Sequence, residues 1–61
     1  MKYSELKRIL KSHGCTVIRE GGNHELWTSP ITKNIFPVGR HDSQEVKTGT
    51  LKAILKQAGI Q

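Results

Sequence analysis

The sequence contains a single cysteine, and none of its apolar segments approaches the roughly 20 residues that a membrane span requires. Cys15 therefore cannot form a disulfide within the chain. Together with the histidines at positions 13, 24 and 41, it lacks the short ligand spacings of a structural zinc site. A lone thiol without a signal-peptide pattern is typical of a reducing compartment. We therefore expect a cytoplasmic protein with no membrane segment, no bound metal and no other cofactor.

The chain is also too short to bury a large core. At 61 residues, only about 60 % of the surface of the unfolded chain is removed from water on folding, and stability is marginal. Domains of this size are often stabilised by disulfides, a metal or a partner. Since the sequence offers neither of the first two, we expect residues 1–61 to form one domain that gains stability from a protein partner.

The charge is strongly of one sign. The formal net charge is +5 and the isoelectric point is near 9.8, which indicates a polyanionic partner: most often nucleic acid, with an acidic protein or a membrane surface as alternatives. Basic side chains on solvated helix faces would give the same balance. The candidate nucleic-acid-binding residues are Lys7, Arg8, Lys11, Arg40, His41, Lys47, Lys52 and Lys56.

The first element is predicted to be a helix over residues 4–13. Ser4 is the expected N-cap, Glu5 places a negative charge in the first turn, and Gly14 follows as the stop signal. One face carries the apolar side chains and His13, and the rest of the surface is basic.

The last element is the clearest helix. Its apolar stripe has helical spacing and consists of Leu51, Ile54, Leu55 and Ala58. Thr48 or Thr50 is the expected N-cap, and Gly59 is the expected stop.

Between the helices, three segments read as strands, at residues 15–19, 24–28 and 35–38. The Gly-Gly-Asn turn at 21–23 indicates a hairpin, because these residues tolerate positive φ. Pro37 suggests an edge or the end of the third strand. Sequential strands joined by short turns pair as an antiparallel meander, so the predicted fold is α+β, in the order αβββα.

In this fold, two helices cover one face of a three-stranded sheet and the other face stays open. The expected core is Leu6, Ile9, Leu10, Val17, Leu26, Ile35, Leu51, Ile54 and Leu55. Trp27 and Tyr3 could stack on bases, but a lone Trp in a strand of so small a domain is more often part of the core. Cys15 is expected to pack as a small apolar residue.

His24 is the principal candidate for chemistry. It follows the Gly-Gly-Asn turn and opens a strand, where its side chain can project from the sheet. Histidine changes its charge near neutral pH and can act as a general acid or base. The alternative is an exposed turn histidine without a catalytic role. His41 could bind phosphate with Arg40 or be solvated beside Asp42, and His13 is expected to be a packing residue or one that interacts with the helix dipole.

The whole chain resembles the HicA toxin family. The resemblance rests on Tyr3-Ser4-Glu5-Leu6 opening a helix, on Gly22-Asn23-His24 before the second strand with Trp27 three residues later, on Pro37 and His41, and on the closing run GTLKAILKQAGI. It implies a fold like that of double-stranded-RNA-binding domains and a ribosome-independent toxin that cleaves messenger RNA. It also implies His24 as the catalytic residue and a HicB-type antitoxin that covers it. The family more usually has Ser where this chain has Asn23.

Three functions are therefore possible. The first is a ribonuclease in which His24 transfers protons while the 2′-hydroxyl of RNA attacks the adjacent phosphorus, with basic side chains steadying the phosphate charge. This mechanism predicts a 2′,3′-cyclic phosphate and indifference to chelators. The second is a non-catalytic module that binds RNA duplexes by shape, and substitution of His24 separates the two. A regulator that binds only an acidic protein is a third reading.

Overall fold

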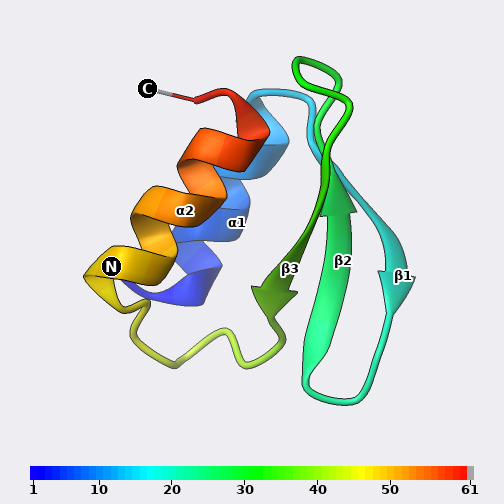
Figure 1. The fold of residues 1–61 in the computed structure, drawn as a ribbon. Coiled ribbons are helices and arrows are strands. Elements are labelled where there is room, and N and C mark those ends of the chain that lie inside the picture. The colour runs from blue at the N-terminus through cyan, green and yellow to red at the C-terminus, as the bar shows by residue number, and fades with distance from the viewer. Residues whose placement is uncertain (61) are drawn as a thin grey trace.

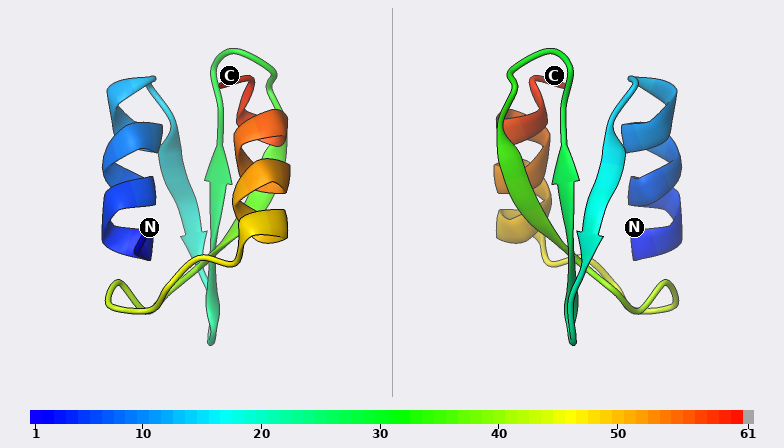
Figure 2. Two further views of the ribbon diagram at one scale, coloured as in Figure 1. Left: turned by 90° about the vertical axis from the view of Figure 1, so that its left-hand side faces the viewer. Right: turned by 90° about the vertical axis from the view of Figure 1, so that its right-hand side faces the viewer.

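The computed structural model describes residues 1–60 and confirms the predicted α+β fold. The elements follow in the order α1 (Tyr3–Ser12), β1 (Thr16–Glu20), β2 (His24–Thr28), β3 (Ile35–Gly39) and α2 (Thr48–Ala58). The strands form one antiparallel sheet in the order β1-β2-β3, and both helices cover the same face of it (Figure 1). Figure 2 shows the helices side by side in front of the sheet, with the opposite face of the sheet open. Neither helix within residues 1–60 has the length and apolar character needed to cross a membrane.

Both helices begin without the side-chain caps that the sequence suggests. The N-cap of α1 is Lys2 rather than Ser4, and the N-cap of α2 is Lys47 rather than Thr48 or Thr50. The segment after β3 runs past the start of α1, so the first free N–H groups of that helix donate to backbone carbonyls: Tyr3 to Gln44 (3.0 Å) and Ser4 to Asp42 (3.1 Å). A tertiary contact thus does what a serine cap would otherwise do.

The ends of the helices agree better with the sequence. Gly14 follows α1 with φ of 87°, and Gly59 ends α2 with φ of 76°. Both residues occupy the left-handed region, which glycine adopts without the steric cost that other residues meet there.

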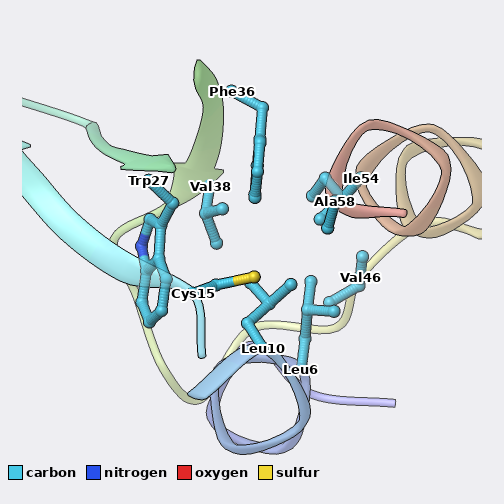
Figure 3. Close-up of a cluster of buried hydrophobic side chains, with 9 residues drawn as sticks. All are labelled: Leu6, Leu10, Cys15, Trp27, Phe36, Val38, Val46, Ile54 and Ala58. Atoms are coloured by element: carbon cyan, nitrogen blue, oxygen red, sulfur yellow. The ribbon is translucent and has the colours of Figure 1, made fainter. Parts of the chain in front are cut away.

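The core lies between the sheet and the helices (Figure 3). It consists of Leu6, Leu10, Cys15, Trp27, Phe36, Val38, Val46, Ile54 and Ala58. The expectations for Leu6, Leu10 and Ile54 are confirmed, as are the buried positions of Trp27 and Cys15. Ile9, Leu51 and Leu55 are only half-buried.

The prediction that three strand residues belong to the core is wrong. Trp27 pairs with Phe36 across β2 and β3, and both side chains face the helices. Because successive side chains of a strand point to opposite faces, Leu26 and Ile35 fall on the open face, and Ile35 is 58 % exposed. Val17 pairs with Trp27 but belongs to an edge strand and stays 37 % exposed.

Both edges of the sheet are irregular. β3 is an edge strand, as Pro37 suggests, and that proline pairs with Leu26 of the central strand. The register of β1 against β2 shifts between Val17 and Arg19, which is a bulge at Ile18. Proline and bulges both interrupt the hydrogen-bonding row that another strand would need in order to pair with an edge.

The elements define two ends of the molecule. The turn end contains the β1–β2 turn (residues 21–23), the segment 40–47 and the N-terminal ends of both helices (Figure 1). The loop end, opposite to it, contains the β2–β3 loop (residues 29–34) and the C-terminal ends of both helices.

Candidate active site

His24 is the first residue of β2, directly after the β1–β2 turn, and it is exposed. It lines a shallow hollow of about 310 Å³ together with Arg19, Gly21, Gly22, Asn23 and Leu26. Leu26 shares the open face with His24 because the two lie two residues apart on one strand, and Arg19 pairs with Leu26 from the neighbouring strand. The imidazole is therefore accessible at the rim of a concave surface that also holds a guanidinium group.

The β1–β2 turn, which precedes His24, does not have the positive φ angles that its glycines and asparagine suggest. Within residues 1–60, positive φ occurs only at Gly14, Lys33 and Gly59, so Gly21, Gly22 and Asn23 all lie outside that region. The turn is closed instead by a hydrogen bond from the Gly21 N–H to the carbonyl of His24 (2.8 Å).

Arg40, the residue directly after β3, holds this turn by hydrogen bonds. Its Nη1 donates to the carbonyls of Gly22 (3.1 Å) and Gly21 (3.4 Å), and its backbone N–H donates to the carbonyl of Asn23 (3.2 Å). The pairing of His24 with Gly39 is thus continued beyond the strands, and the segment that carries His41 runs alongside the turn that carries His24. His41 itself is exposed.

The predicted RNA-binding residue Lys7 is held by protein groups. Its side chain is only 12 % exposed, and Nζ lies 2.6 Å from Asp42 Oδ1, 3.2 Å from Glu25 Oε1 and 3.3 Å from the carbonyl of Arg40. Burial alone would lower the pKa of Lys7, but hydrogen bonds to Asp42 and Glu25 and their negative charges outweigh it, and the pKa is raised. The hydrogen bond from Lys7, aided by the charges of Lys7 and Lys11, lowers the pKa of Asp42.

A second hollow, of about 290 Å³, lies on the surface of α1. It is lined by Ser4, Lys7, Arg8, Lys11 and Asp42, so the structure brings the three predicted basic residues of α1 together. Arg8 and Lys11 are exposed there.

The remaining predicted RNA contacts belong to α2 and its N-cap. Lys47, Lys52 and Lys56 are all exposed, but Lys56 lies in the last turn of α2 and therefore toward the loop end. His13, the C-cap of α1, is also exposed, and its Nδ1 lies 3.0 Å from the carbonyl of Ile9. Residues 1–60 contain no group of three or more histidine, cysteine or acidic side chains arranged to hold a metal ion.

Sequence reasoning missed two residues of this region. Arg19 lines the hollow of His24, and Glu25 holds Lys7 while accepting a hydrogen bond from Trp27 Nε1 (3.1 Å). Alternation along the second strand carried a signal for Glu25, because it shares the helix-facing side with Trp27 and an acidic residue there needs a partner.

Residues 3–60 match the family described as HicA toxin of bacterial toxin-antitoxin, and the chain therefore belongs to the HicA toxin family. The chain is 42 % identical to the probable mRNA interferase HicA 1 of Photorhabdus laumondii over 98 % of this chain and 100 % of that protein. It is 40 % identical to the probable mRNA interferase toxin HicA of Escherichia coli K12, over 98 % of each chain. With the probable mRNA interferase HicA of Pseudomonas fluorescens the identity is 34 %, over 100 % of this chain and 98 % of that protein. No solved structure matches the chain.

Proposed function

We propose that this protein is the toxin of a type II toxin–antitoxin pair and an endoribonuclease that cleaves messenger RNA in the cytoplasm. Membership of the HicA family and full-length similarity to proteins named as probable mRNA interferases support the class of activity. The observation that carries the assignment of the site is the accessible imidazole of His24, held at the rim of a hollow beside Arg19.

The proposed reaction is transfer of a phosphoryl group within the RNA, from the 5′-oxygen of one nucleotide to the 2′-oxygen of the nucleotide before it. His24 takes the proton of a 2′-hydroxyl as its oxygen attacks the adjacent phosphorus, and the bond from phosphorus to the 5′-oxygen of the next nucleotide breaks. The products are a 2′,3′-cyclic phosphate and a free 5′-hydroxyl, so the leaving oxygen must gain a proton. His41, on the segment beside the turn of His24, is the candidate donor. No metal takes part in this scheme.

The negative charge on the phosphate requires cationic neighbours. Arg40 uses Nη1 to brace the turn, which leaves other N–H groups of its planar guanidinium to face the phosphate. Arg8 and Lys11 on α1, with Lys52 and Lys56 on α2 and its N-cap Lys47, supply the longer-range attraction for the RNA backbone.

The proposed partner is a HicB-type antitoxin. We expect this partner to cover His24 with an acidic or aromatic surface, which would complement both the exposed imidazole and the basic faces of the helices. The complex should also stabilise the toxin, whose small size makes its stability marginal, because a partner that binds only the folded state favours folding.

The alternative is a non-catalytic module that binds RNA duplexes. The order of elements and the basic helices suit this function equally well, and phosphate contacts alone would supply its affinity. Such a module should lose little when His24 is replaced.

The deciding experiment is cleavage of a purified single-stranded transcript by the wild-type protein and by His24→Ala, each with and without EDTA. We expect cleavage by the wild type that survives EDTA and ends in a 2′,3′-cyclic phosphate, and a loss of at least about 100-fold in His24→Ala. Equal cleavage by both proteins would refute the role of His24. RNA binding without cleavage by the wild type would favour the binding module, and loss of cleavage in EDTA would refute the metal-free scheme.

A further inference from the structure

Lys7 has no hydrogen-bonding capacity left for RNA. A lysine ammonium carries three N–H donors, and three acceptors surround Nζ: Glu25 Oε1, Asp42 Oδ1 and the carbonyl of Arg40. Two of these acceptors are carboxylates, whose charge more than cancels that of Lys7 and would repel a phosphate. Only 12 % of the side chain is exposed. Its basic neighbours on the same helix, Arg8 and Lys11, are exposed.

The partners of Lys7 come from the two segments that carry the candidate catalytic histidines. Glu25 directly follows His24, and Asp42 directly follows His41. These segments lie far apart in the sequence, and one ammonium group holds the residue next to each histidine.

Glu25 and Asp42, the two carboxylate partners of Lys7, are each held by a second hydrogen bond to another part of the protein. Glu25 Oε1 also accepts a hydrogen bond from the indole of Trp27, which is 1 % exposed and belongs to the core. The backbone carbonyl of Asp42 accepts the N–H of Ser4 at the start of α1. Lys7 therefore connects two anchored points and does not merely neutralise two mobile surface carboxylates.

We propose that Lys7 is a positioning residue, which sets the placement of the His24 strand relative to the His41 loop, and that it does not bind RNA. The inference rests on the proposed ribonuclease function, in which one group removes a proton from the 2′-hydroxyl while another protonates the leaving oxygen. Such a pair must stand on opposite sides of one phosphorus, and small errors in their spacing are costly in rate. Loss of Lys7 leaves Glu25 half-buried without its cation and releases Asp42.

The test separates the maximal rate of cleavage from the affinity for RNA. We expect Lys7→Met to lower kcat by about tenfold to 100-fold with KM within about twofold, because misplacement of catalytic groups acts on the chemical step. Lys11→Met and Arg8→Met are the matched variants on the same helix. They should raise KM and leave kcat within about twofold, because each removes a phosphate contact. A rise in KM with unchanged kcat in Lys7→Met would overturn the proposal.

Asp42→Asn serves as a second variant, because it removes only one charge from an exposed position and is compatible with folding. If Lys7 positions the site, Asp42→Asn lowers kcat in the same direction as Lys7→Met, by a smaller factor. If Lys7 is instead an RNA contact, releasing it from Asp42 leaves kcat unchanged or increases the efficiency of cleavage. Circular dichroism and thermal melts establish that each variant is folded at the assay temperature.

Binding of a 2′-O-methyl RNA, which cannot be cleaved, gives a readout independent of catalysis. Lys7→Met should bind it with a Kd within about twofold of the wild type and with an unchanged salt dependence, whereas Lys11→Met should bind more weakly, with a slope reduced by about one. Equal weakening by both substitutions would overturn the proposal. Absence of cleavage in the wild type refutes the proposed function and the positioning role together, whereas cleavage that depends on His24 but not on Lys7 refutes the positioning role alone.

Discussion

The two ends of this small domain are built in opposite ways. At the loop end, three side chains of the β2–β3 loop bind the last carbonyls of α2: Ser29 Oγ donates to Ala58 (2.7 Å), and Thr32 Oγ1 and Asn34 Nδ2 donate to Gln57 (2.6 and 3.1 Å). At the turn end, the β1–β2 turn is exposed, and the groups that hold it belong to Arg40 and to the backbone.

The residues that stabilise the fold and the residues that serve function therefore lie at different ends of the domain. This division matters because the stability of so small a chain is marginal. The carbonyls at the end of a helix have no partners within it, and the loop end satisfies those of α2 with side chains of which Ser29 is buried, Thr32 is half-buried and Asn34 is exposed. The turn end leaves an imidazole, two hollows and several cations facing solvent, where they can meet RNA. Substitutions at the loop end should therefore change the free energy of unfolding, and substitutions at the turn end should change activity.

The largest effect on stability is expected for Gly59→Ala at the loop end. Gly59 has φ of 76°, and an added Cβ would lie 2.8 Å from Cγ2 of both Ile31 and Thr32. Left-handed backbone with a Cβ and overpacking each cost about 1–2 kcal/mol, so the loss should be about 2–4 kcal/mol by urea unfolding. Cleavage measured per folded molecule should stay at the wild-type level, because the substitution lies at the end away from His24.

Gly22→Ala is the matched substitution at the turn end. An added Cβ there meets nothing within 4 Å, and φ lies outside the left-handed region. Its free energy of unfolding should stay within about 0.5 kcal/mol of the wild type. Equal destabilisation by the two glycine substitutions would contradict the division between the ends.

Ser29→Ala should have the next largest effect. Ser29 is 1 % exposed, its Oγ donates to the carbonyl of Ala58, and the same Oγ accepts the N–H of Ile31 (3.1 Å). The substitution removes the partner of the Ala58 carbonyl in a buried contact and that of the Ile31 N–H in a part-buried one, and a loss of about 2 kcal/mol is expected. Chemical denaturation of the two proteins under identical conditions measures it, and a difference below about 0.5 kcal/mol would show that the loop does not stabilise the end of α2.

The order of elements was predictable from the sequence because each element carries its own local signals. The apolar stripe before Gly59 and the β-branched segments around the Gly-Gly-Asn turn require no knowledge of distant residues. The helix N-caps and the strand faces were not predictable in this way. The sequence favours Ser4 as the cap, but in the structure the N–H of Ser4 donates to the carbonyl of Asp42, which lies 38 positions later in the chain. Leu26 and Trp27 are adjacent apolar residues, and only packing against Phe36 decides which of them faces the core.

The candidate site divides in the same manner. His24 is predictable because a turn motif places it, and the motif is local. The residues around His24 are not predictable in this way. Arg19 reaches the hollow through strand pairing, and Lys7 contacts Glu25 and Asp42 because α1 packs on the sheet. From sequence alone, a basic residue on a predicted helix face is therefore interpreted as a nucleic-acid contact. Only the structure shows whether it is paired with carboxylates instead.

The smallest effect is expected for the pH dependence of the ion pair between Lys7 and Asp42 at the turn end. The pKa of Asp42 is lowered in the folded protein, so its contribution to stability is present above the ordinary pKa of a carboxyl group and is lost as the pH falls through the lowered value. The pKa of Lys7 is raised, so its contribution is lost only when the pH rises into the strongly alkaline range. Wild type should therefore exceed Asp42→Asn in free energy of unfolding at pH 7 by a small margin, because Asp42 is exposed and water screens the pair. The margin should vanish once the pH falls below the lowered pKa of Asp42, where the carboxylate of the wild type is protonated too. A margin that persists in acid would mean that Asp42 acts through its shape or its neutral hydrogen bonds, and that the turn end is held together by something other than the charge of Lys7.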